Sequence, residues 1–504
     1  MAITTPNNNA NDDADDQSSG NHGERTNEGN RLIEFMIPLV TPIKGDDNQH
    51  YVAFADAPHV VVPHSPKSST AMQLILQRYY ASTGRWAGSV PKSLASDYLS
   101  AQAESEKPVT ISMRAYSEND VIYLDAIRDN TIIKISSDDV TEVETGPGLF
   151  TRHGINRALP ELIEVPANLR DLLAFVRIPE EALPALLACL INTWLTALPQ
   201  PVILLQGTAA AGKTMGLRFL LDLVDPSTEN PGSTLGKDEK ILRTMSRLRR
   251  CFVFDNVSYV DHDTSDLLAK ITTGAESVFR QLYSDSNPDV IQIKRPVFLN
   301  GIIEGFSRND LASRSVAFEL AAIPQSERRS PDELAAAWQQ VLPGLFTALV
   351  QLASHVLHEL PTVSAAGIDH RSPDLVRITA IVSDALGIDG VPYLQASIDR
   401  LSDAVLGSST VGLALSEITQ CMTGTPCHHC RHSESASPAW MRYAEFREFL
   451  ARHLPEDQAR DLPKLARAFA ESLKRLESDL GAGLGIKVVS KRSKAGMEYQ
   501  VVAA

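Results

Sequence analysis

The chain has 504 residues, with 62 acidic and 47 basic side chains, a net charge of −15 and five cysteines. This length suits about two to four domains and leaves room for a full-sized core. So few cysteines exclude a disulfide framework. The acidic balance argues against a nucleic-acid-binding coat over the whole surface, although it leaves a local basic face open. The N-terminus lacks the basic and then apolar pattern of a signal peptide, so we expect a cytoplasmic protein.

The N-terminal third predicts a tail and a small domain. Residues 1–30 are rich in Asn, Asp, Ser and Gly and carry a net charge of −5. They cannot bury enough apolar surface to offset the entropy of ordering, which predicts a disordered acidic tail. Residues 31–160 mix alternating apolar and polar stretches with two helical patterns, Met72–Leu76 and Leu94–Ala103. We expect an α+β domain of unknown role there.

The most apolar stretch of the chain is Leu183–Leu198. It is shorter than a bilayer span and is interrupted by Pro184 and Asn192. We therefore predict a buried helix that leads into the next domain, and no membrane partner.

A strand, a glycine loop and a helix follow one another from residue 201 onward. The apolar run Val202–Leu205 predicts a buried strand, GTAAAGKT matches the spacing G-x-x-x-x-G-K-[ST], and MGLRFLLDLV has helical periodicity. The loop amides and the lysine suit phosphates, and the threonine hydroxyl suits Mg²⁺. The predicted binding residues for ATP and Mg²⁺ are Gly207, Thr208, Ala209, Ala210, Ala211, Gly212, Lys213 and Thr214.

Two further apolar runs, at residues 251–255 and 296–300, predict strands of the same parallel sheet. The first ends in Asp255, which at this distance from the loop is expected to hold the hydration shell of Mg²⁺. The second ends in Asn300, whose carboxamide suits an attacking water; the alternative is an asparagine that simply closes the strand into a turn.

Arginines follow the last of these strands in SRNDLASR. Arg308 or Arg314, with Arg314 favoured, could reach the γ-phosphate of a neighbouring subunit and neutralise transition-state charge. The alternative for each is a surface salt bridge.

The order of these motifs resembles a known family. GTAAAGKT, FVFDN, TTGAESVFRQLYSD, RPVFLNG and RNDLASRSVAFEL are similar to the ATPase core of superfamily 3 helicases of phages, plasmids and mobile elements, and more narrowly to the C-terminal half of virus-type primase–helicases. The resemblance covers about residues 200–325. It implies an AAA+-like α/β P-loop core working as a ring, with a hexamer favoured. It also implies catalytic roles for Lys213, Asp255, Asn300 and Arg314, and a DNA channel that Arg280 and Tyr283 face.

Asn256 departs from the family pattern. In that family a glutamate that acts as general base usually follows the Walker B aspartate, which corresponds here to Asp255. An asparagine cannot accept a proton. Either another carboxylate serves, with Asp238, Glu239 and Glu276 as candidates, or hydrolysis is slow and the protein works as an ATP-dependent clamp or switch.

The C-terminal segment carries a net charge of +3 from Trp440 onward. Two helices, Met441–His453 and Asp461–Leu480, precede a hairpin whose predicted turn spans residues 491–496, which is the chain order of a winged helix. The expected DNA-binding residues are Arg467, Lys474, Arg475, Lys491, Arg492 and Lys494, with Lys464 on the same helix face. The alternative is a small packing module with a solvated basic turn.

A cluster of cysteines and histidines precedes this segment. Cys421, Cys427, Cys430 and His432 could form a tetrahedral Zn²⁺ site. All four lie within twelve residues of one loop, and strong sites usually use two separated ligand pairs, so an exposed loop with thiols is the favoured alternative.

The expected architecture has six parts: an acidic tail (1–30), an α+β domain (31–160), the P-loop ATPase core (161–330), a helical region (331–420), a Cys/His loop (421–438) and a winged helix (439–504). The expected function is ATP-driven unwinding or remodelling of DNA during replication of a mobile element. An ATP-dependent switch and a helicase loader are the alternatives.

Overall fold

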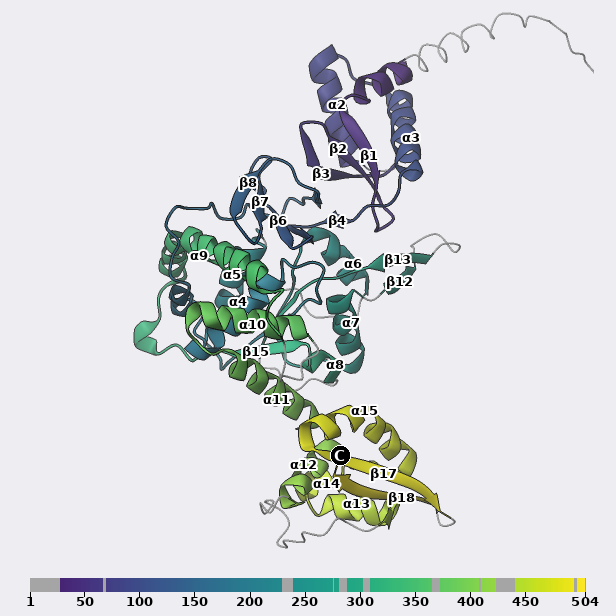
Figure 1. Ribbon diagram of the computed structural model, residues 1–504. Helices are drawn as coiled ribbons and strands as arrows, with labels where there is room; N and C mark the ends of the chain where they lie inside the picture. The colour runs from purple at the N-terminus through teal and green to yellow at the C-terminus, as the bar shows by residue number, and fades with distance from the viewer. Residues whose placement is uncertain are drawn as a thin grey trace, which may run out of the picture.

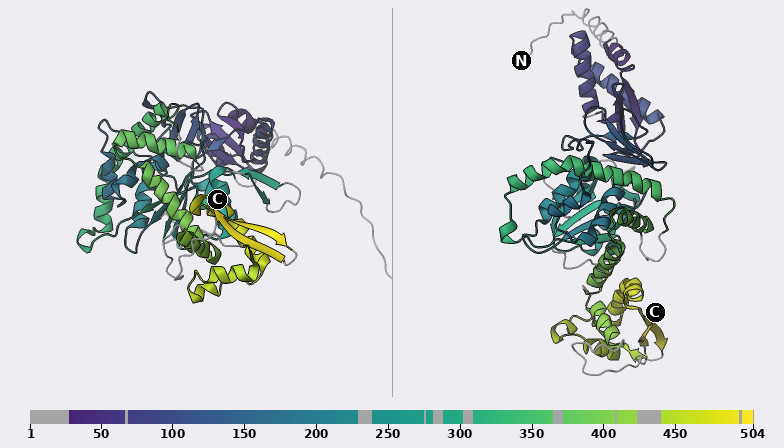
Figure 2. Two further views of the ribbon diagram at one scale, coloured as in Figure 1. Left: turned by 60° about the horizontal axis from the view of Figure 1, so that its bottom comes forward. Right: turned by 60° about the vertical axis from the view of Figure 1, so that its left-hand side comes forward.

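The computed structural model describes residues 28–66, 69–228, 239–274, 276–280, 288–301, 309–364, 372–407, 409–422, 440–493 and 496–503. Three bodies follow one another along the chain, with the N-terminal body at the top of Figure 1, a large central body below it and a C-terminal body at the bottom. The right-hand view in Figure 2 shows the same order from top to bottom.

The N-terminal body is a five-stranded sheet with helices against one face. The sheet has the strand order β1-β2-β3-β9-β4, in which β1 to β3 are antiparallel and β9 runs parallel to both β3 and β4. Its elements are β1 (Val40–Lys44), β2 (His50–Phe54), β3 (Ala57–His64), α2 (Thr70–Thr83), α3 (Ser89–Ser105), β4 (Ile111–Ser112) and β9 (Leu149–Thr151). Residues 28–36 are also helical, so the last three residues of the predicted disordered tail belong to a helix instead. Leu32 and Met36 are fully buried in this body, and that burial holds the helix in place.

A four-stranded antiparallel meander follows, and its core is shared with the central body. The strands are β5 (Ala115–Glu118), β6 (Val121–Asp125), β7 (Ile132–Ile135) and β8 (Val140–Val143). Ile122, Leu124 and Ile133 belong to the largest hydrophobic cluster of the protein, together with residues of the central helices. Residues 31–160 therefore contribute to two separate cores.

The central body is built on a parallel sheet, as predicted. The strand order is β11-β14-β10-β15, and all neighbours are parallel. The strands are β10 (Val202–Gln206), β11 (Phe252–Val257), β14 (Val297–Gly301) and β15 (Ser315–Glu319). Side chains alternate between the two faces: Ile203 and Leu205 join one hydrophobic cluster, and Val202 and Leu204 join another. The sheet is thus buried on both sides, as expected for parallel strands.

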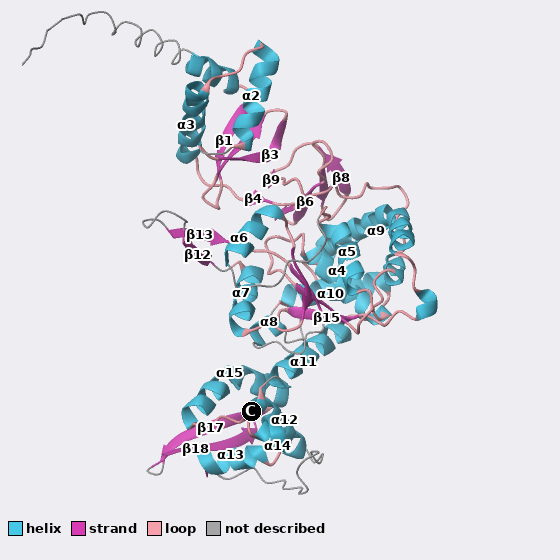
Figure 3. Cartoon of the chain, turned by 180° about the vertical axis from the view of Figure 1, so that it is seen from behind, coloured by secondary structure: helices cyan, strands magenta, loops and turns pink. Residues whose placement is uncertain are grey.

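Helices cover both faces of this sheet (Figure 3). They are α4 (Leu183–Asn192), α5 (Lys213–Val224), α6 (Glu239–Leu248), α7 (His262–Thr273), α8 (Asn309–Ala312), α9 (Pro331–Glu359), α10 (Pro373–Leu386) and α11 (Val391–Gly407), with 3₁₀ turns at Leu169–Ala174, Glu180–Ala182 and Gln325–Glu327. A hairpin of β12 (Glu276–Arg280) and β13 (Pro288–Gln292) projects from the body beside α7 in Figures 1 and 3. Every residue of α4 is buried, which agrees with the buried helix predicted in this stretch.

Helix α9 is unbroken at Pro343. The helical pattern of Leu334–Leu360 contains this proline, which favours a break, but α9 begins with a capping box formed by Ser330 and Glu333 and continues through Pro343. A proline inside a helix costs one backbone hydrogen bond, and burial of Leu345 and Phe346 in the main core offsets that loss. Helix α9 is long and apolar enough to cross a membrane by length and composition alone, but 67% of its most apolar window is buried inside the protein.

The C-terminal body combines helices with a three-stranded antiparallel sheet of order β16-β18-β17. Its elements are α12 (Thr410–Met422), β16 (Met441–Arg442), α13 (Tyr443–Ala451), α14 (Glu456–Ala459), α15 (Ala466–Leu484), β17 (Ile486–Ser493) and β18 (Gly496–Ala503). In its core Phe446 stacks on Tyr499, and Phe469 packs edge-on against both rings. The predicted turn is too long, because Ser493 pairs with Gly496 and the strands therefore include Lys491 and Arg492.

Candidate nucleotide-binding site

The glycine loop lies at the carboxyl end of β10 and leads directly into α5. Gly207 has a φ of 153°, and a Cβ atom there would lie 2.8 Å from the carbonyl oxygen of Leu320. Gly212, at the start of α5, has a φ of 78° in the left-handed region. Both positions therefore need glycine. Ala210 is also left-handed, with a φ of 64°, so the loop holds a side chain in a sparsely populated conformation.

The side chain of Lys213 folds back onto the glycine loop. Its Nζ donates hydrogen bonds to the carbonyl oxygens of Gly207, at 2.8 Å, and of Thr208, at 2.9 Å. An ammonium has three donors, and phosphate oxygens are stronger acceptors than carbonyl oxygens. The ammonium is therefore held against the loop by bonds that a phosphate oxygen can replace.

Thr214 and Asp255 meet beside the loop. The Thr214 hydroxyl, in the first turn of α5, donates to Asp255 Oδ1 at 3.3 Å. Strand β11, which carries Asp255, is not next to β10 in the sheet, since β14 lies between them. A hydroxyl from the first turn of α5 and a carboxylate from β11 form a pair of oxygen ligands of the kind that Mg²⁺ takes.

A bulge in β11 sets the direction of Asp255. Asn256 has a φ of 57°, and the pairing with β14 shifts between Phe254 and Val257. The backbone N–H of Asn256 donates to Asn300 Oδ1 at 3.0 Å. At Gly301 a Cβ atom would lie only 1.9 Å from the Val257 carbonyl oxygen, so only glycine fits beside the bulge.

Asn300 sits on β14 directly beside Leu205 and is 1% exposed. Its Oδ1 is used by Asn256, whereas Nδ2 has no hydrogen-bond partner within the part of the chain that the structure describes. A buried amide donor without a partner is costly. The amide can therefore donate to an oxygen that enters the site, whereas its acceptor is already occupied.

Arg314 lies at the other edge of the sheet. Its carbonyl oxygen accepts the N–H of Val202, the first residue of β10, so it is separated from the glycine loop by the length of that strand. The guanidinium donates to the carbonyl oxygen and to Oδ1 of Asp310, both at 3.1 Å. This arrangement excludes contact between Arg314 and the glycine loop of the same chain.

The expected DNA-binding residues divide between the hairpin β12–β13 and the C-terminal body. Lys464, Arg467, Lys474 and Arg492 are exposed. Arg467 contacts Glu471 at 3.3 Å, and Lys491 lies 4.0 Å from the centre of the Trp440 ring and 3.5 Å from Glu498. Arg280 ends strand β12. The side chains of Arg280 and Arg475, and the whole of Lys494, lie outside the described residues, as do Tyr283 and Arg308.

Two other predicted groups also fall outside the described part. Cys427, Cys430 and His432 are not described, and Cys421 belongs to α12 without a described side chain. The same holds for Asp238 and for the side chains of Glu239 and Glu276, the candidate bases. In the described ranges no group of three or more His, Cys, Asp or Glu residues could hold a metal ion.

Sequence reasoning missed a set of basic residues at the amino edge of the sheet. Arg250 comes just before β11, and Lys294 and Arg295 come just before β14. The signal was present, since a basic pair stands before an apolar strand in both RRCFVF and KRPVFL.

The fold and the glycine loop together define the class of protein. The protein has an α/β core with a parallel sheet, and a glycine loop joins the end of a central strand to the start of a helix, a construction suited to binding phosphates.

Residues 167–404 match the family model described as the actinomycete integrative conjugative element replication protein. No curated protein matches the chain. Among solved structures, the chain is similar to SCCmec type IV Cch, described as an active helicase, with 10% identity, a TM-score of 0.45, and coverage of 92% of this chain and 93% of that one. It is also similar to the apo A form of the NrS-1 C-terminal region, with 9% identity, a TM-score of 0.40, and coverage of 94% and 99%.

Proposed function

We propose that this protein is an ATP-dependent motor that unwinds or remodels DNA during replication of a mobile element. The observation that carries the proposal is the contact between Thr214 and Asp255 at 3.3 Å, because it joins the glycine loop to an acidic strand end two strands away. The match of residues 167–404 to a replication protein family supports the role in replication.

The chemistry assigned to the site uses four side chains. Lys213 and the loop amides hold the β- and γ-phosphates of ATP, and Thr214 and Asp255 hold Mg²⁺. Asn300 donates its free amide hydrogens to the γ-phosphate or to the attacking water. Its carbonyl oxygen keeps Asn256 and the bulge in place, so one side chain connects the metal ligand to the reacting group.

The strand order supports an AAA+-like core of the superfamily 3 type. The strand with Asn300 lies between the strands of the glycine loop and of Asp255. Arg314 lies at the opposite edge of the sheet from the loop. This position suits an arginine finger that contacts the ATP of a neighbouring subunit and does not contact the ATP of its own subunit. We therefore propose a homo-oligomeric ring, with a hexamer favoured, in which Arg314 of the next copy completes each ATP site.

The C-terminal body is proposed to be a winged helix that binds DNA. Helix α12, strand β16, helices α13 and α15, and the hairpin β17–β18 follow in the winged-helix chain order. Helix α15 would lie in the major groove and β17–β18 would contact phosphates. Lys474 and Arg492 are exposed on these two elements.

The test is phosphate release by the purified chain with and without DNA, together with strand displacement on a forked DNA substrate. We expect ATP hydrolysis that DNA stimulates and that Lys213→Ala removes. Strand displacement with ATP would separate a helicase from a loader, which would hydrolyse ATP without displacing a strand.

Asn256 favours a second candidate, an ATP-dependent switch. The side chain at this position is exposed and is an amide, so the usual general base is absent from its usual place. If this absence limits the rate, Asn256→Glu should raise phosphate release. If the rate falls or is unchanged, another carboxylate serves as the base, and the motor is favoured.

Zinc remains a separate proposal for the loop of Cys421, Cys427, Cys430 and His432. Stoichiometric zinc in purified protein, lost in Cys427→Ser, is the expected result. Zinc below one equivalent in the unchanged protein would favour an exposed thiol-containing loop.

A further inference from the structure

A cavity of about 360 Å³ lies between the N-terminal body and the amino edge of the central sheet. It is lined on one side by residues that precede β11 and β14, and on the other by residues around β1 and β4. The glycine loop is at the other end of β10, five residues away along the strand. At about 3.3 Å per residue this separates the two places by roughly 16 Å. The cavity is therefore distinct from the proposed ATP site.

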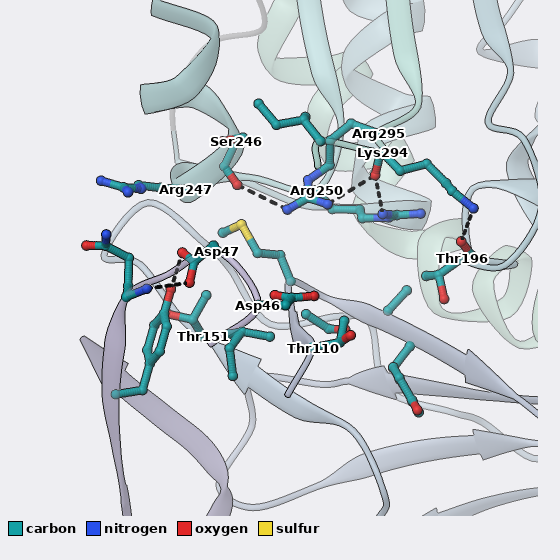
Figure 4. Close-up of a pocket in the computed structure, with 18 of the residues that line it drawn as sticks. Asp46, Asp47, Thr110, Thr151, Thr196, Ser246, Arg247, Arg250, Lys294 and Arg295 are labelled. Carbon is teal, nitrogen blue, oxygen red and sulfur yellow. Dashed lines mark hydrogen bonds between the residues drawn. The ribbon is translucent and has the colours of Figure 1, made fainter. Parts of the chain in front are cut away.

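Four cations form the wall on the side of the central body (Figure 4). They are Arg247, Arg250, Lys294 and Arg295. Arg250 is 4% exposed, and its guanidinium donates to the carbonyl oxygens of Thr193 and Lys294 and to Gln200 Oε1. Burial, followed by the neighbouring Arg295, lowers the pKa of Arg250 to about 9, so it still carries its charge at neutral pH.

Lys294 and Arg295 also donate hydrogen bonds only to neutral oxygens among the described residues. Lys294 Nζ donates to the carbonyl oxygens of Thr196 and Ala197. Arg295 donates to the carbonyl oxygens of Ser246 and Lys294, and its Nε is buried with no partner in the described ranges. No described carboxylate lies within ion-pair distance of these side chains. Arg250 is buried and Lys294 and Arg295 are partly buried. Asp46, Asp47 and Asp225 act on Arg295 only from beyond ion-pair distance. The positive charge of this wall is therefore only partly compensated among the described residues, and a bound anion would offset the cost of its burial.

The two acids of the opposite wall have other partners. Asp47 accepts the hydroxyl of Tyr51 at 2.8 Å and the N–H of Gln49 at 3.1 Å. Asp46 is hydrogen-bonded to Thr110, and burial raises its pKa. In Figure 4 these acids lie below the row of cations. The lining thus keeps an excess of two positive charges.

Phosphate is the anion that this chemistry recognises best. Arginine donors bind phosphate oxygens with strong, charge-assisted hydrogen bonds. The volume is within the range of pockets for small organic ligands and leaves space beyond a phosphate group. Hydroxyls of Thr110, Thr151 and Thr196 line the remainder and can bond to a sugar or a base.

We propose that this cavity binds a nucleoside phosphate, through the cations at the amino edge of the sheet, as a second site separate from the glycine loop. The ligand is either a free nucleotide or one nucleotide of a bound strand. Because the cations directly precede the strands that carry Asp255 and Asn300, occupation links the N-terminal body to the proposed ATP site.

The test is equilibrium binding to the full-length chain carrying Lys213→Ala, which weakens the loop as a competing phosphate site. The probes are thymidine monophosphate, thymidine, inorganic phosphate and a short oligothymidylate. We expect thymidine monophosphate or the oligonucleotide to bind, and the affinity to fall at least about tenfold in Arg295→Gln. If the ligand is a free nucleotide, Arg295→Gln should weaken the binding of both probes. If the ligand is one nucleotide of a strand, it should weaken the binding of the oligonucleotide alone. Either supports the proposal.

Further variants guard against a folding defect. Arg247→Gln, at an exposed position of the same wall, should also weaken binding, and Asp46→Asn should strengthen it by removing a repelling carboxylate. Arg78→Gln is the matched control, since Arg78 is held by Asp56 at 2.9 Å in the N-terminal body. Affinities that stay within about twofold in both Arg295→Gln and Arg247→Gln would overturn the proposal, as would thymidine or inorganic phosphate binding as tightly as the nucleotide. None of these results depends on ATP hydrolysis, so the proposed motor can fail while this site stands, and the reverse.

Discussion

The two edges of the central sheet carry candidate phosphate sites that are built in different ways. At the carboxyl edge, eight consecutive residues from Gly207 to Thr214 form a loop, and two strand ends add Asp255 and Asn300. At the amino edge, the cavity is assembled from the turn after β1, from β4 and from the segments before β11 and β14. The first site is set by local backbone geometry, whereas the second exists only because two bodies meet. Substitutions at the carboxyl edge should therefore affect ATP hydrolysis, whereas substitutions at the amino edge should affect binding of a nucleoside phosphate in the cavity.

The largest effect is expected at Arg314. Arg314→Ala should lower ATP turnover by about a thousandfold and spare nucleotide binding if, as proposed, the arginine neutralises transition-state charge on a neighbouring copy. Phosphate release and ATP affinity are the two measurements. Mixing the variant with unchanged protein should lower activity by more than dilution does.

Asp310→Asn is the control for this prediction, since Asp310 holds the Arg314 guanidinium at 3.1 Å. If Asp310→Asn costs as much turnover as Arg314→Ala, the arginine has a structural role in its own chain and the proposed finger is wrong.

The next effect concerns Gly301 beside the bulge of β11. Gly301→Ala should destabilise the fold by about 3 kcal/mol or more, because the new Cβ would overlap the Val257 carbonyl oxygen. Denaturant unfolding measures the change. Gly154→Ala is the matched control, since a Cβ atom there meets no atom within 4 Å. Equal stability of the two variants would mean that the bulge adapts easily.

Two substitutions at Asn300 separate its two proposed roles, as the acceptor for the Asn256 N–H and as an amide donor to the reacting group. Asn300→Asp keeps an acceptor for Asn256 and replaces the amide donor with a carboxylate, so turnover should fall by about 100-fold. Stability should also fall, because the position is 1% exposed and a carboxylate there is costly to bury. Asn300→Ala removes both and should lose stability as well. Unchanged turnover in Asn300→Asp would show that the free amide has no part in the reaction.

A smaller effect is expected in the C-terminal body. Arg492→Ala should weaken DNA binding and reduce the slope of log affinity against log salt by about one. Arg78→Ala in the N-terminal body should leave the slope unchanged. An unchanged slope in Arg492→Ala would favour a packing module over a winged helix.

The central sheet could be predicted from sequence because its signals are local. Strands β10, β11 and β14 agree within two residues with the predicted runs, since each is a short apolar segment next to a turn or a loop. The long helix α9 could not be predicted in full, because packing of the main core outweighs the break that Pro343 favours locally. The division of residues 31–160 between two cores also depends on distant contacts, such as the buried pairing of Arg114 with Asp225 at 3.3 Å.

The candidate site was predictable in its residue types and less so in its geometry. Motif spacing predicted Lys213, Thr214 and Asp255, and the structure brings them together. The use of Asn300 Oδ1 by the backbone of Asn256 depends on a bulge that apolar periodicity does not reveal. The cavity at the amino edge was missed because Asp46 and Arg295 are separated by most of the N-terminal half of the chain.

Phosphate release from ATP by the unchanged chain and by Lys213→Ala, each with and without DNA, tests the central claim most directly. We expect DNA-stimulated release from the unchanged protein and a loss of at least about 100-fold in the variant, because Lys213 is the cation proposed to hold the phosphates. Equal release by the two proteins, or no release above background from the unchanged chain with DNA, would contradict the assignment of the carboxyl edge as an ATPase site.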